Sequence, residues 1–437
     1  MIKIIYNFIS FSGIFVLMGI AWLMSSDRKN MNWRLISWAI GLQMIFALVI
    51  FIFPPGAAFF LWVNDAVVAV MGSAAAGAEF MFGRLALSPG TVNSSGEESL
   101  GFFLAFQGLP TIIFFSALMS ILYFFNIIPR IIKGFAYVFT RLFRISGAES
   151  LCAASNIFVG IESTLTIRPF LESMTKSEMA TVLTVGMSTV ASNVLALYVF
   201  SLQNEFPTIA AHLVSASFLS APAAIIMSKI MVPETETPET LGRHVELSYE
   251  REKSVFEAVI NGANSGVKLI VGIVALLIAV LGLVALFDLI LGGAGEKLNS
   301  LFGIGIDWSL SGLLGYVFYP VALIIGIPPG DAGAVAGIIG ERVVVTEVTA
   351  YRDLAELMAS GVLTDPRSAV VCAYALCGFA HVASLAIFIG GITAIAPGTI
   401  HTLSRIGIKA LIAATLACLM TACIAGTFFS KGSVIFG

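Results

Sequence analysis

Two glutamates lie in otherwise apolar stretches of the chain. Glu162 is in the segment ASNIFVGIESTLTIRPF, and Glu347 is in the segment VVVTEVTAYRDL. An ionised carboxylate in hydrocarbon is costly unless it is paired or hydrated, but in a cavity it can accept two hydrogen bonds from vicinal hydroxyls, as in a ribose. We therefore expect both glutamates to line one polar cavity. The alternative is structural ion pairs, with Arg168 for the first glutamate and with Arg342 or Arg352 for the second.

A histidine and two hydroxyl side chains are the other polar residues inside apolar segments that could bind a solute or an ion. His381 lies in ALCGFAHVASLAIFIGG, where Gly378 and Ser384 favour a locally unwound helix with free backbone groups. Ser188 and Thr189 lie in the middle of another apolar segment, and their oxygen atoms are hard ligands suited to sodium. Each pattern also has a structural interpretation, namely a satisfied core histidine and ordinary hydrogen bonds between helices.

Enzyme motifs are missing from the sequence. The chain contains no P-loop, no HExxH and no GxSxG motif. The five cysteines lie in apolar segments without metal-binding spacing, and Asp331, after Pro328-Pro329-Gly330, is predicted to cap a helix. We therefore predict neither enzymatic activity nor an organic cofactor. Two alternatives stay open: an intramembrane enzyme that uses Glu162 and Glu347 for acid–base chemistry, and a passive solute channel.

The composition is typical of a membrane protein. Of the 437 residues, 58% are hydrophobic and 11% are charged, and the mean hydropathy is +0.98. A soluble domain carries roughly 25% charged residues, so this chain cannot cover a globule of its size with polar surface. The net charge of −3 and the lack of a basic tract argue against nucleic-acid binding. Lipid is therefore expected to contact much of the surface.

Long apolar segments predict an all-α membrane protein with eight transmembrane helices. About 20 residues are needed to cross the hydrocarbon core, and the first segment is too long for a signal peptide. The expected spans are 4–24, 35–53, 108–128, 179–202, 206–231, 266–291, 368–396 and 406–428.

Basic residues in the loops orient these spans. When the spans alternate in direction, four basic clusters fall on one side, which is the cytoplasm by the positive-inside rule. Both termini are then extracytoplasmic, in a multi-pass protein of the plasma membrane. The clusters are Arg28, Lys29 and Arg34; Arg130, Lys133, Arg141 and Arg144; Lys229, Arg243, Arg251 and Lys253; and Arg405 and Lys409.

Three further stretches are apolar but do not read as simple spans. Residues 57–83 contain two carboxylates and are expected to form an interfacial helix. Residues 147–172 are interrupted near Gly160, and residues 313–351 are interrupted at Pro328-Pro329-Gly330; each is followed by a helix with a polar centre and another span. Paired interruptions of this kind predict two re-entrant helical hairpins in an inverted repeat around a binding site.

Six blocks of the sequence resemble the bacterial concentrative nucleoside transporters, in the same order, from about residue 100 onwards. The resemblance implies a homotrimer in the bacterial inner membrane, with a scaffold and a mobile domain in each protomer. It also implies import of nucleosides by symport with a cation, sodium or proton, through an elevator-type motion. The blocks are LPTIIFFSALMSILYFF (109–125), AASNIFVG (153–160), IRPFL (167–171), GMSTVAS (186–192), TEVTAYRDL (346–354) and CGFAHVASLAIFIGG (377–391).

The resemblance also implies a division of the chain into four parts. Residues 1–145 form scaffold spans and the interfacial helix, and residues 146–232 form the first hairpin with spans four and five. The polar stretch after them reads as a cytoplasmic loop, which together with scaffold span six makes up residues 233–308. Residues 309–437 form the second hairpin with spans seven and eight. The second and fourth parts together make the transport domain.

The family's substrate-binding residues are matched unevenly. The glutamate of its second hairpin corresponds to Glu347, while His381 replaces its ribose-binding asparagine. The first hairpin tip lacks the family's base-contacting glutamine, and Glu162 takes the place of the glutamate there. Because an altered hydrogen-bonding partner changes discrimination between substrates, we expect an unusual base preference, with purine nucleosides as a candidate. The implied substrate-binding residues are Glu162, Ser163, Glu347, Phe379, His381 and Ser384.

The family's sodium ligands are better retained. They are a side chain of the first hairpin, a backbone carbonyl three residues further on, and hydroxyl groups of the fourth span. These positions favour sodium as the coupling ion, and protons are the alternative. The corresponding positions are Asn156, Val159, Ser188 and Thr189.

Overall fold

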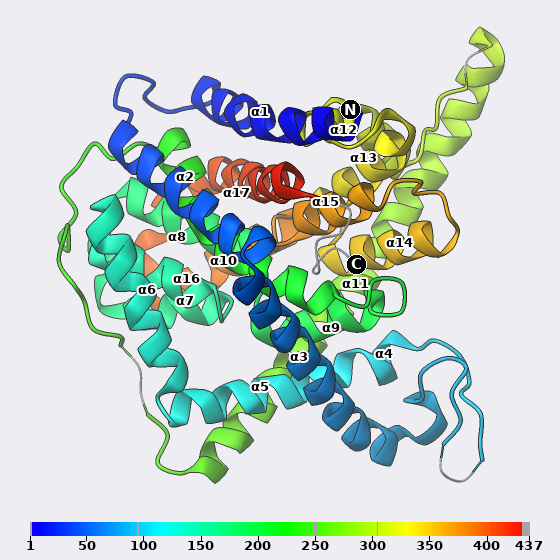
Figure 1. The fold of residues 1–437 in the computed structure, drawn as a ribbon, viewed down its shortest axis with the longest axis horizontal. Helices are drawn as coiled ribbons and strands as arrows, with labels where there is room; N and C mark the ends of the chain where they lie inside the picture. The colour runs from blue at the N-terminus through cyan, green and yellow to red at the C-terminus, as the bar shows by residue number, and fades with distance from the viewer. Residues whose placement is uncertain (1, 94–95, 249–250, 304, 431–437) are drawn as a thin grey trace.

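The computed structural model describes residues 2–93, 96–248, 251–303 and 305–430, and every regular element in these ranges is helical (Figure 1). The predicted all-α class is therefore confirmed. The elements up to the long polar loop are α1 (Ile2–Leu23), α2 (Trp33–Ala47), η1 (Leu48–Ile52), α3 (Pro54–Phe82), η2 (Gly83–Leu85), α4 (Leu104–Gln107), α5 (Leu109–Phe124), α6 (Ile127–Phe143), α7 (Gly147–Asn156), η3 (Ile161–Ser173), α8 (Lys176–Ser188), α9 (Ser192–Leu202) and α10 (Ile209–Met231). Those after it are α11 (Val255–Phe302), α12 (Leu310–Ile324), α13 (Pro329–Val344), α14 (Glu347–Ala359), α15 (Pro366–Leu376), α16 (Val382–Ile395), η4 (Pro397–Thr399) and α17 (Ile400–Phe428).

Eight helical stretches in the described part of the chain are long and apolar enough to cross a membrane. Their membership differs from the prediction at two places. The expected span 368–396 is divided into α15 and α16, neither of which is long enough by itself. Residues 57–83, expected to be interfacial, lie in the stretch Pro54–Leu85, which does qualify. Its Glu79 is within one turn of the end of α3, where a carboxylate can reach the membrane surface.

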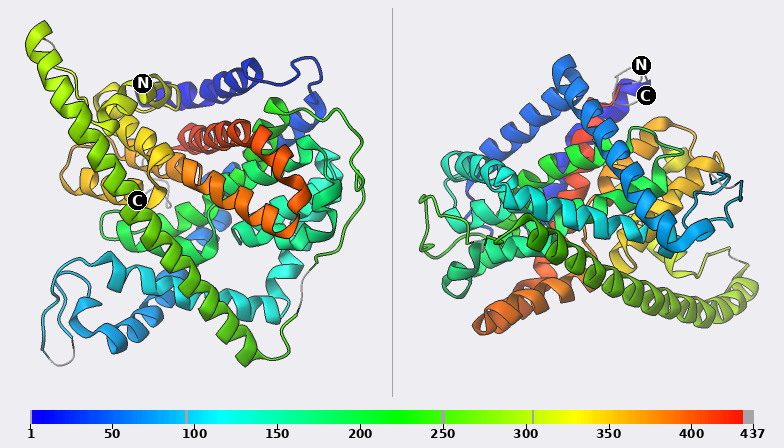
Figure 2. Two further views of the ribbon diagram at one scale, coloured as in Figure 1. Left: turned by 180° about the vertical axis from the view of Figure 1, so that it is seen from behind. Right: turned by 90° about the horizontal axis from the view of Figure 1, so that it is seen from below.

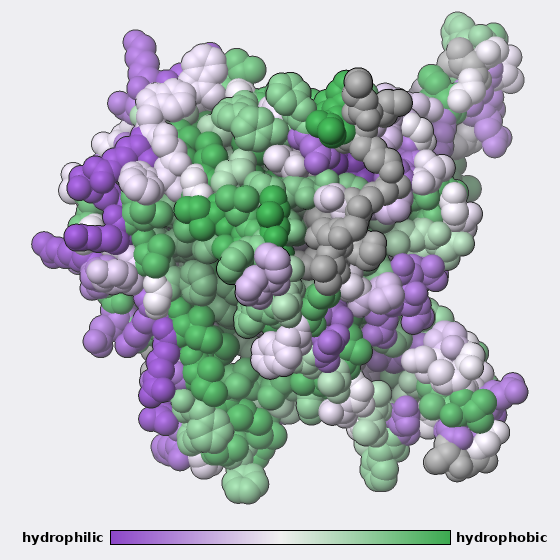
Figure 3. All heavy atoms as spheres, viewed as in Figure 1, coloured by the Kyte–Doolittle hydropathy of each residue, from purple (hydrophilic) through white to green (hydrophobic). Residues whose placement is uncertain are grey.

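The surface has the pattern of a protein embedded in a bilayer. In Figure 3, hydrophobic residues cover the centre of the visible face, and hydrophilic residues gather towards its left and right edges. Helices α1 and α17 run between these two edges (Figure 1). At the back of the molecule, the 48-residue α11 crosses obliquely and packs along α5 (Figure 2). The hydrocarbon layer therefore fits between the two hydrophilic edges.

Two successive runs of elements share one layout. In the first, α7 and η3 precede an interrupted helix, α8 and α9, which is followed by α10. In the second, α13 and α14 precede another interrupted helix, α15 and α16, which is followed by α17 through η4. Hence each half of the repeat contains a helical pair, a broken helix and a continuous helix.

The two helical pairs are interrupted at residues 157–160 and 345–346. The first interruption agrees with the prediction near Gly160. The interruption predicted at Pro328-Pro329-Gly330 is also present, between α12 and α13, but the break at residues 345–346 between α13 and α14 was not predicted. Pro329 is the first helical residue of α13, where a missing backbone N–H costs no hydrogen bond.

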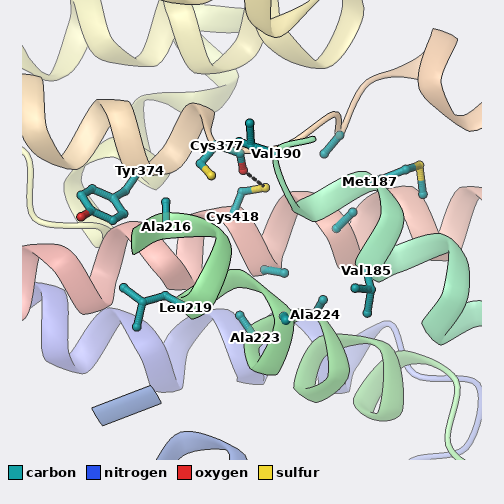
Figure 4. Close-up of a cluster of buried hydrophobic side chains, with 14 of the residues drawn as sticks. Val185, Met187, Val190, Ala216, Leu219, Ala223, Ala224, Tyr374, Cys377 and Cys418 are labelled. Atoms are coloured by element: carbon teal, nitrogen blue, oxygen red, sulfur yellow. Dashed lines mark hydrogen bonds between the residues drawn. The ribbon is translucent and has the colours of Figure 1, made fainter. Parts of the chain in front are cut away.

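The buried centre of the protein forms around α17. This helix packs against α1, α8, α10 and α15. Small side chains of α10, among them Ala216, Ala223 and Ala224, allow the close approach of helices that stabilises membrane bundles (Figure 4). The Sγ atom of Cys418 donates a hydrogen bond of 2.8 Å to the carbonyl oxygen of Cys377. All five cysteines are free and buried, in agreement with their interpretation as core residues.

Asp331 does not cap the helix in which it lies. The N-cap residue of α13 is Pro328. The fully buried Asp331 carboxylate instead accepts hydrogen bonds from the backbone N–H groups of Thr364 and Asp365 at 3.0 and 3.1 Å. It also accepts hydrogen bonds from the hydroxyl groups of Thr364 and Ser368 at 2.8 and 2.6 Å. These bonds join the start of α13 to the start of α15.

We expect Asp331→Ala to destabilise the protein by about 3 kcal/mol, because it leaves buried donors without a charged acceptor. The measurement is the midpoint of thermal unfolding of the purified full-length chain. Glu356→Gln is the control, since Glu356 forms an exposed pair with Arg352 that is worth little. Equal midpoints for the Asp331 variant and the unaltered chain would contradict this role.

Candidate functional site

One cavity lies between α11 and the breaks in the two half-repeats. Its wall contains both Glu162 and Glu347, and α11 contributes an apolar side. The structure therefore brings together two carboxylates from distant parts of the chain. Of the other predicted substrate-binding residues, Phe379, His381 and Ser384 also line the cavity. The residues of α11 are Leu269, Ile273, Leu276 and Leu277.

Several helical segments begin at the wall of this cavity. Helix α14 begins at Glu347, His381 is the N-cap residue of α16, and Asn193 lies in the first turn of α9. Segment η3 begins at Ile161, also in the wall. The N-terminal end of a helix carries a partial positive charge that stabilises carboxylates and hydrogen-bond acceptors. The backbone itself therefore favours acidic side chains at this site.

Glu347 is more buried than Glu162, with only 3% of the residue exposed. Its Oε1 atom accepts a hydrogen bond of 2.7 Å from the hydroxyl group of Tyr198. The ring of Tyr198 lies against that of Tyr351, with 4.9 Å between the centroids. The Nε2 atom of His381 is 3.0 Å from Oε2, but no described residue donates a well-directed hydrogen bond to this oxygen. Oε2 therefore remains available to a hydroxyl group of a solute.

The imidazole of His381 is held by the start of its own helix. Its Nδ1 atom accepts a hydrogen bond of 3.2 Å from the backbone N–H of Ser384. In the neutral ring the hydrogen is then on Nε2, the atom that faces Glu347 and also lies 2.7 Å from the hydroxyl of Ser384. His381 is thus both a helix cap and a group of the cavity wall.

The first helical pair, α7 and η3, contributes differently from the second pair, α13 and α14. Glu162 lines the cavity with an exposed side chain. Ser163 is buried away from the lining, where its Oγ atom is 3.7 Å from the Sγ atom of Cys152. Among the described residues, the ion pairs considered for the two glutamates do not form; Arg352 pairs with Glu356 instead.

The four candidate sodium ligands lie where α7 and α8 end. Asn156 is the last residue of α7, and Ser188 is the last residue of α8. The turn between α7 and η3 meets the break after α8, because the backbone N–H of Ser192 donates to the carbonyl of Phe158 at 3.2 Å. Helix C-terminal ends carry partial negative charge and expose carbonyl groups, which favours a cation.

The side chains at this place can still act as ligands. The Oδ1 atom of Asn156 is buried and has no hydrogen-bond partner among the described residues. The hydroxyl groups of Ser188 and Thr189 both donate to the carbonyl oxygen of Val185, at 3.3 and 3.0 Å. A hydroxyl that donates one hydrogen bond keeps two lone pairs with which it can bind a cation. The donor set therefore fits a hard monovalent cation.

Sequence reasoning assigned no role in binding to three residues of this region. Tyr198 was predicted to be an ordinary member of an apolar helix, and Asn193 only a part of the polar centre of that helix. In the structure, Tyr198 donates a hydrogen bond to Glu347, and Asn193 lines the cavity. Arg342 is fully buried, and its Nη1 atom is 3.5 Å from the carbonyl oxygen of Gly378. Its place near the ends of α13 and α15 matches the preference of cations for helix C-termini. A polar residue within an apolar segment was the available signal for each.

Comparisons with known proteins identify relatives along almost the whole chain. Residues 12–85 match the family model described as Na+ dependent nucleoside transporter N-terminus, and residues 212–426 match the corresponding C-terminus model. Residues 105–205 match the model described as nucleoside recognition.

Individual relatives agree with these matches. An uncharacterized transporter of Haemophilus influenzae is 36% identical, over 97% of this chain and 98% of its own length. Solute carrier family 28 member 3 of Mus musculus is 35% identical over 96% of this chain, which spans only 58% of that relative. The structure of CNTnw in an inward-facing substrate-bound state is 33% identical, with a TM-score of 0.88, and 98% of this chain and 99% of that chain are covered. The chain therefore belongs to the concentrative nucleoside transporter family.

Proposed function

We propose that this protein imports nucleosides by symport with a cation, sodium or proton. The observation that carries the proposal is the cavity shared by Glu162 and Glu347. In it, the buried Oε2 atom of Glu347 lies 3.0 Å from Nε2 of His381 and receives no well-directed hydrogen bond from the described residues. A carboxylate held in this way binds a sugar hydroxyl strongly, because hydrogen bonds to charged groups are stronger than those between neutral groups. Members of this family are transporters, which removes the intramembrane enzyme as an alternative.

The two ends of a nucleoside would meet different parts of the wall. Glu347, His381 and Ser384 supply polar atoms for the ribose, and Phe379 supplies an apolar ring. Glu162 takes the place of the family's first-hairpin glutamate and would contact the base side. A carboxylate accepts hydrogen bonds from exocyclic amino groups. This supports a base preference that includes purines with such groups.

Coupling would arise from the contact between the two binding places. Asn156, Val159, Ser188 and Thr189 would hold sodium, and the same hairpin tip continues into the cavity wall at Gly160. A cation bound there neutralises the negative ends of α7 and α8 and fixes the tip. A fixed tip then presents Glu162 to the nucleoside. Binding of the cation would therefore precede or strengthen binding of the solute.

The arrangement of the cavity supports an elevator-type motion. One side of its wall comes from α11, in the part assigned to the scaffold, and the other side comes from the two half-repeats. Apolar side chains at such a boundary permit sliding without the loss of specific polar bonds. We further propose that protomers assemble as homotrimers in the bacterial inner membrane, with both termini outside. The exposed apolar surface of α11 is suited to contact with lipid or with a neighbouring protomer.

Uptake by proteoliposomes tests this function. The purified full-length chain is reconstituted, and uptake of a panel of radiolabelled purine and pyrimidine nucleosides is measured with a sodium gradient, a proton gradient or neither. Accumulation that depends on one gradient is the expected result. Flux that needs no gradient would identify a channel, and absence of flux across the whole panel would overturn the substrate assignment.

Glu347→Gln is expected to lower nucleoside uptake by roughly 10-fold to 100-fold, because it removes the charge from the acceptor without changing its size. Glu356→Gln provides the matched control, since Glu356 is exposed and pairs only with Arg352 among the described residues. Both variants should elute from gel filtration like the unaltered chain. Near-normal uptake by the Glu347 variant would mean that this carboxylate does not bind the solute.

Asn156→Ala is expected to raise the sodium concentration for half-maximal uptake by about 10-fold, since it removes a side-chain ligand. Sodium should also raise the thermal unfolding midpoint of the unaltered chain more than that of the variant. Asn261→Ala is the control, because Asn261 is exposed and bonds to Glu252. An unchanged sodium dependence of both properties would place the cation elsewhere or assign coupling to protons.

A further inference from the structure

The neighbouring ends of α2 and α6 carry a basic cluster that the proposed transport site does not use. Arg34 near the start of α2, Arg141 in the last turn of α6, and Arg144 at its C-cap line one cavity together with His244. No carboxylate lines this cavity. None of the three guanidinium groups forms an ion pair with a described residue. The cluster is therefore a concentration of positive charge that forms no ion pair with a described residue, although Arg144 also lines a neighbouring cavity with Glu149, Glu234 and Glu236.

Such a cluster has a strong preference for phosphate. Guanidinium groups stay charged at any physiological pH, and their planar donors match the oxygen atoms of a phosphate in pairs. Three of them around one hollow repel each other until an anion lies between them. The stacked rings of Tyr137 and His244, with 4.8 Å between centroids, lie at the same end of α6. The cavity therefore has the charge and donors of an anion site.

The faces of α6 place this cavity at a membrane surface. At about 3.6 residues per turn, α6 divides into three stripes. One stripe is buried in the protein, one is apolar but exposed, and one is basic and exposed. An exposed apolar stripe beside a basic stripe is the pattern of a helix that lies along a bilayer interface. The stripes contain Ile128, Ile132 and Phe139; Ile127, Ile131 and Val138; and Arg130, Lys133 and Arg141.

Tryptophan residues mark the same surface. Trp33 precedes Arg34 and is 65% exposed, and Trp22, near the end of α1, is 40% exposed. Exposed tryptophan side chains concentrate at the level of lipid headgroups. In Figure 1, α6 and the junction of α1 with α2 lie at the left, where Figure 3 shows hydrophilic residues along the edge. The positive-inside rule predicts that this side is the cytoplasm.

We propose that Arg34, Arg141 and Arg144 bind the phosphate of an anionic membrane phospholipid, whose acyl chains lie along the exposed apolar stripe of α6. The apolar stripe selects a lipid over a soluble phosphate, because it adds buried hydrocarbon to the charge contact. The lipid would join α2 to α6 and so connect two separate elements of the part assigned to the scaffold. Each arginine near an anionic headgroup strengthens binding several-fold.

Delipidated full-length protein in neutral detergent tests the proposal. Binding of phosphatidylglycerol and phosphatidylcholine with identical acyl chains is measured by native mass spectrometry and by the shift of the thermal unfolding midpoint. Phosphatidylglycerol should bind at least 10-fold more tightly than phosphatidylcholine, and increasing salt should weaken this preference. Soluble glycerol phosphate should compete only at far higher concentration.

Two triple variants distinguish the loss of this site from a general loss of positive charge. Arg34→Gln/Arg141→Gln/Arg144→Gln should lose the preference for phosphatidylglycerol by at least 10-fold. Arg84→Gln/Arg352→Gln/Arg405→Gln removes the same charge from exposed positions outside the cavity and should keep the preference. Equal losses in both variants, no preference in the unaltered protein, or equal competition by glycerol phosphate would each overturn the proposal. If the first triple variant is poorly folded, Arg144→Gln alone should still show a several-fold loss.

Discussion

A break in a helix within a membrane exposes amide and carbonyl groups where water is scarce, and the rest of this structure depends on how those groups are satisfied. Each half-repeat contains one helical pair and one broken helix, so several helix ends meet in the interior of the folded protein. Ends of one polarity meet at the cavity, where Glu347 and His381 begin their helices. Ends of the other polarity meet at Asn156 and Ser188. The dipoles of the backbone thus separate a place for acceptors from a place for a cation.

The two halves satisfy their negative helix ends by different means. In the first half, the buried Oδ1 atom of Asn156 has no partner from the described residues. In the second half, the guanidinium of Arg342 lies near the ends of α13 and α15, and no described carboxylate pairs with it. A buried cation without a carboxylate is tolerated only where carbonyl groups and helix ends replace the counter-ion. The two halves of the repeat therefore share their order of helices but differ in the side chain at their helix ends, which is the neutral Asn156 in the first half and the charged Arg342 in the second.

The surrounding bundle keeps these ends in register. Helix α17 contacts both the first half-repeat, through α8 and α10, and the second, through α15. Gly378 has a positive φ of 122°, and a side chain there would press against the backbone of Ser188 at 2.7 Å. The two breaks can therefore touch only because this position has no Cβ atom. That contact places the break near His381 directly against Ser188, one of the candidate cation ligands.

Local composition was enough to predict much of the architecture. Apolar segments of about 20 residues identify membrane helices because lipid leaves no other solution for the backbone. Glycine and neighbouring polar residues indicated the breaks near Gly160 and before His381. The family followed from six blocks of sequence, and the comparisons confirm it. The same long apolar segments predicted the all-helical class, because a transmembrane strand needs only about 10 residues.

Only the tertiary structure decided which groups meet. The sequence offered Arg342 and Arg352 as partners of Glu347, but folding supplies Tyr198 and His381, which lie far from it in the chain. Asp331 likewise bonds to the start of α15 and not to its own helix. The break between α13 and α14 at residues 345–346 was not predicted, because no proline or glycine marks it as Pro328-Pro329-Gly330 marks the break before α13. The type of each segment depends on local hydrophobicity and backbone chemistry. Which side chains contact each other depends on how helices distant in the sequence pack together, and the separation of two residues along the sequence does not determine the distance between them in the fold.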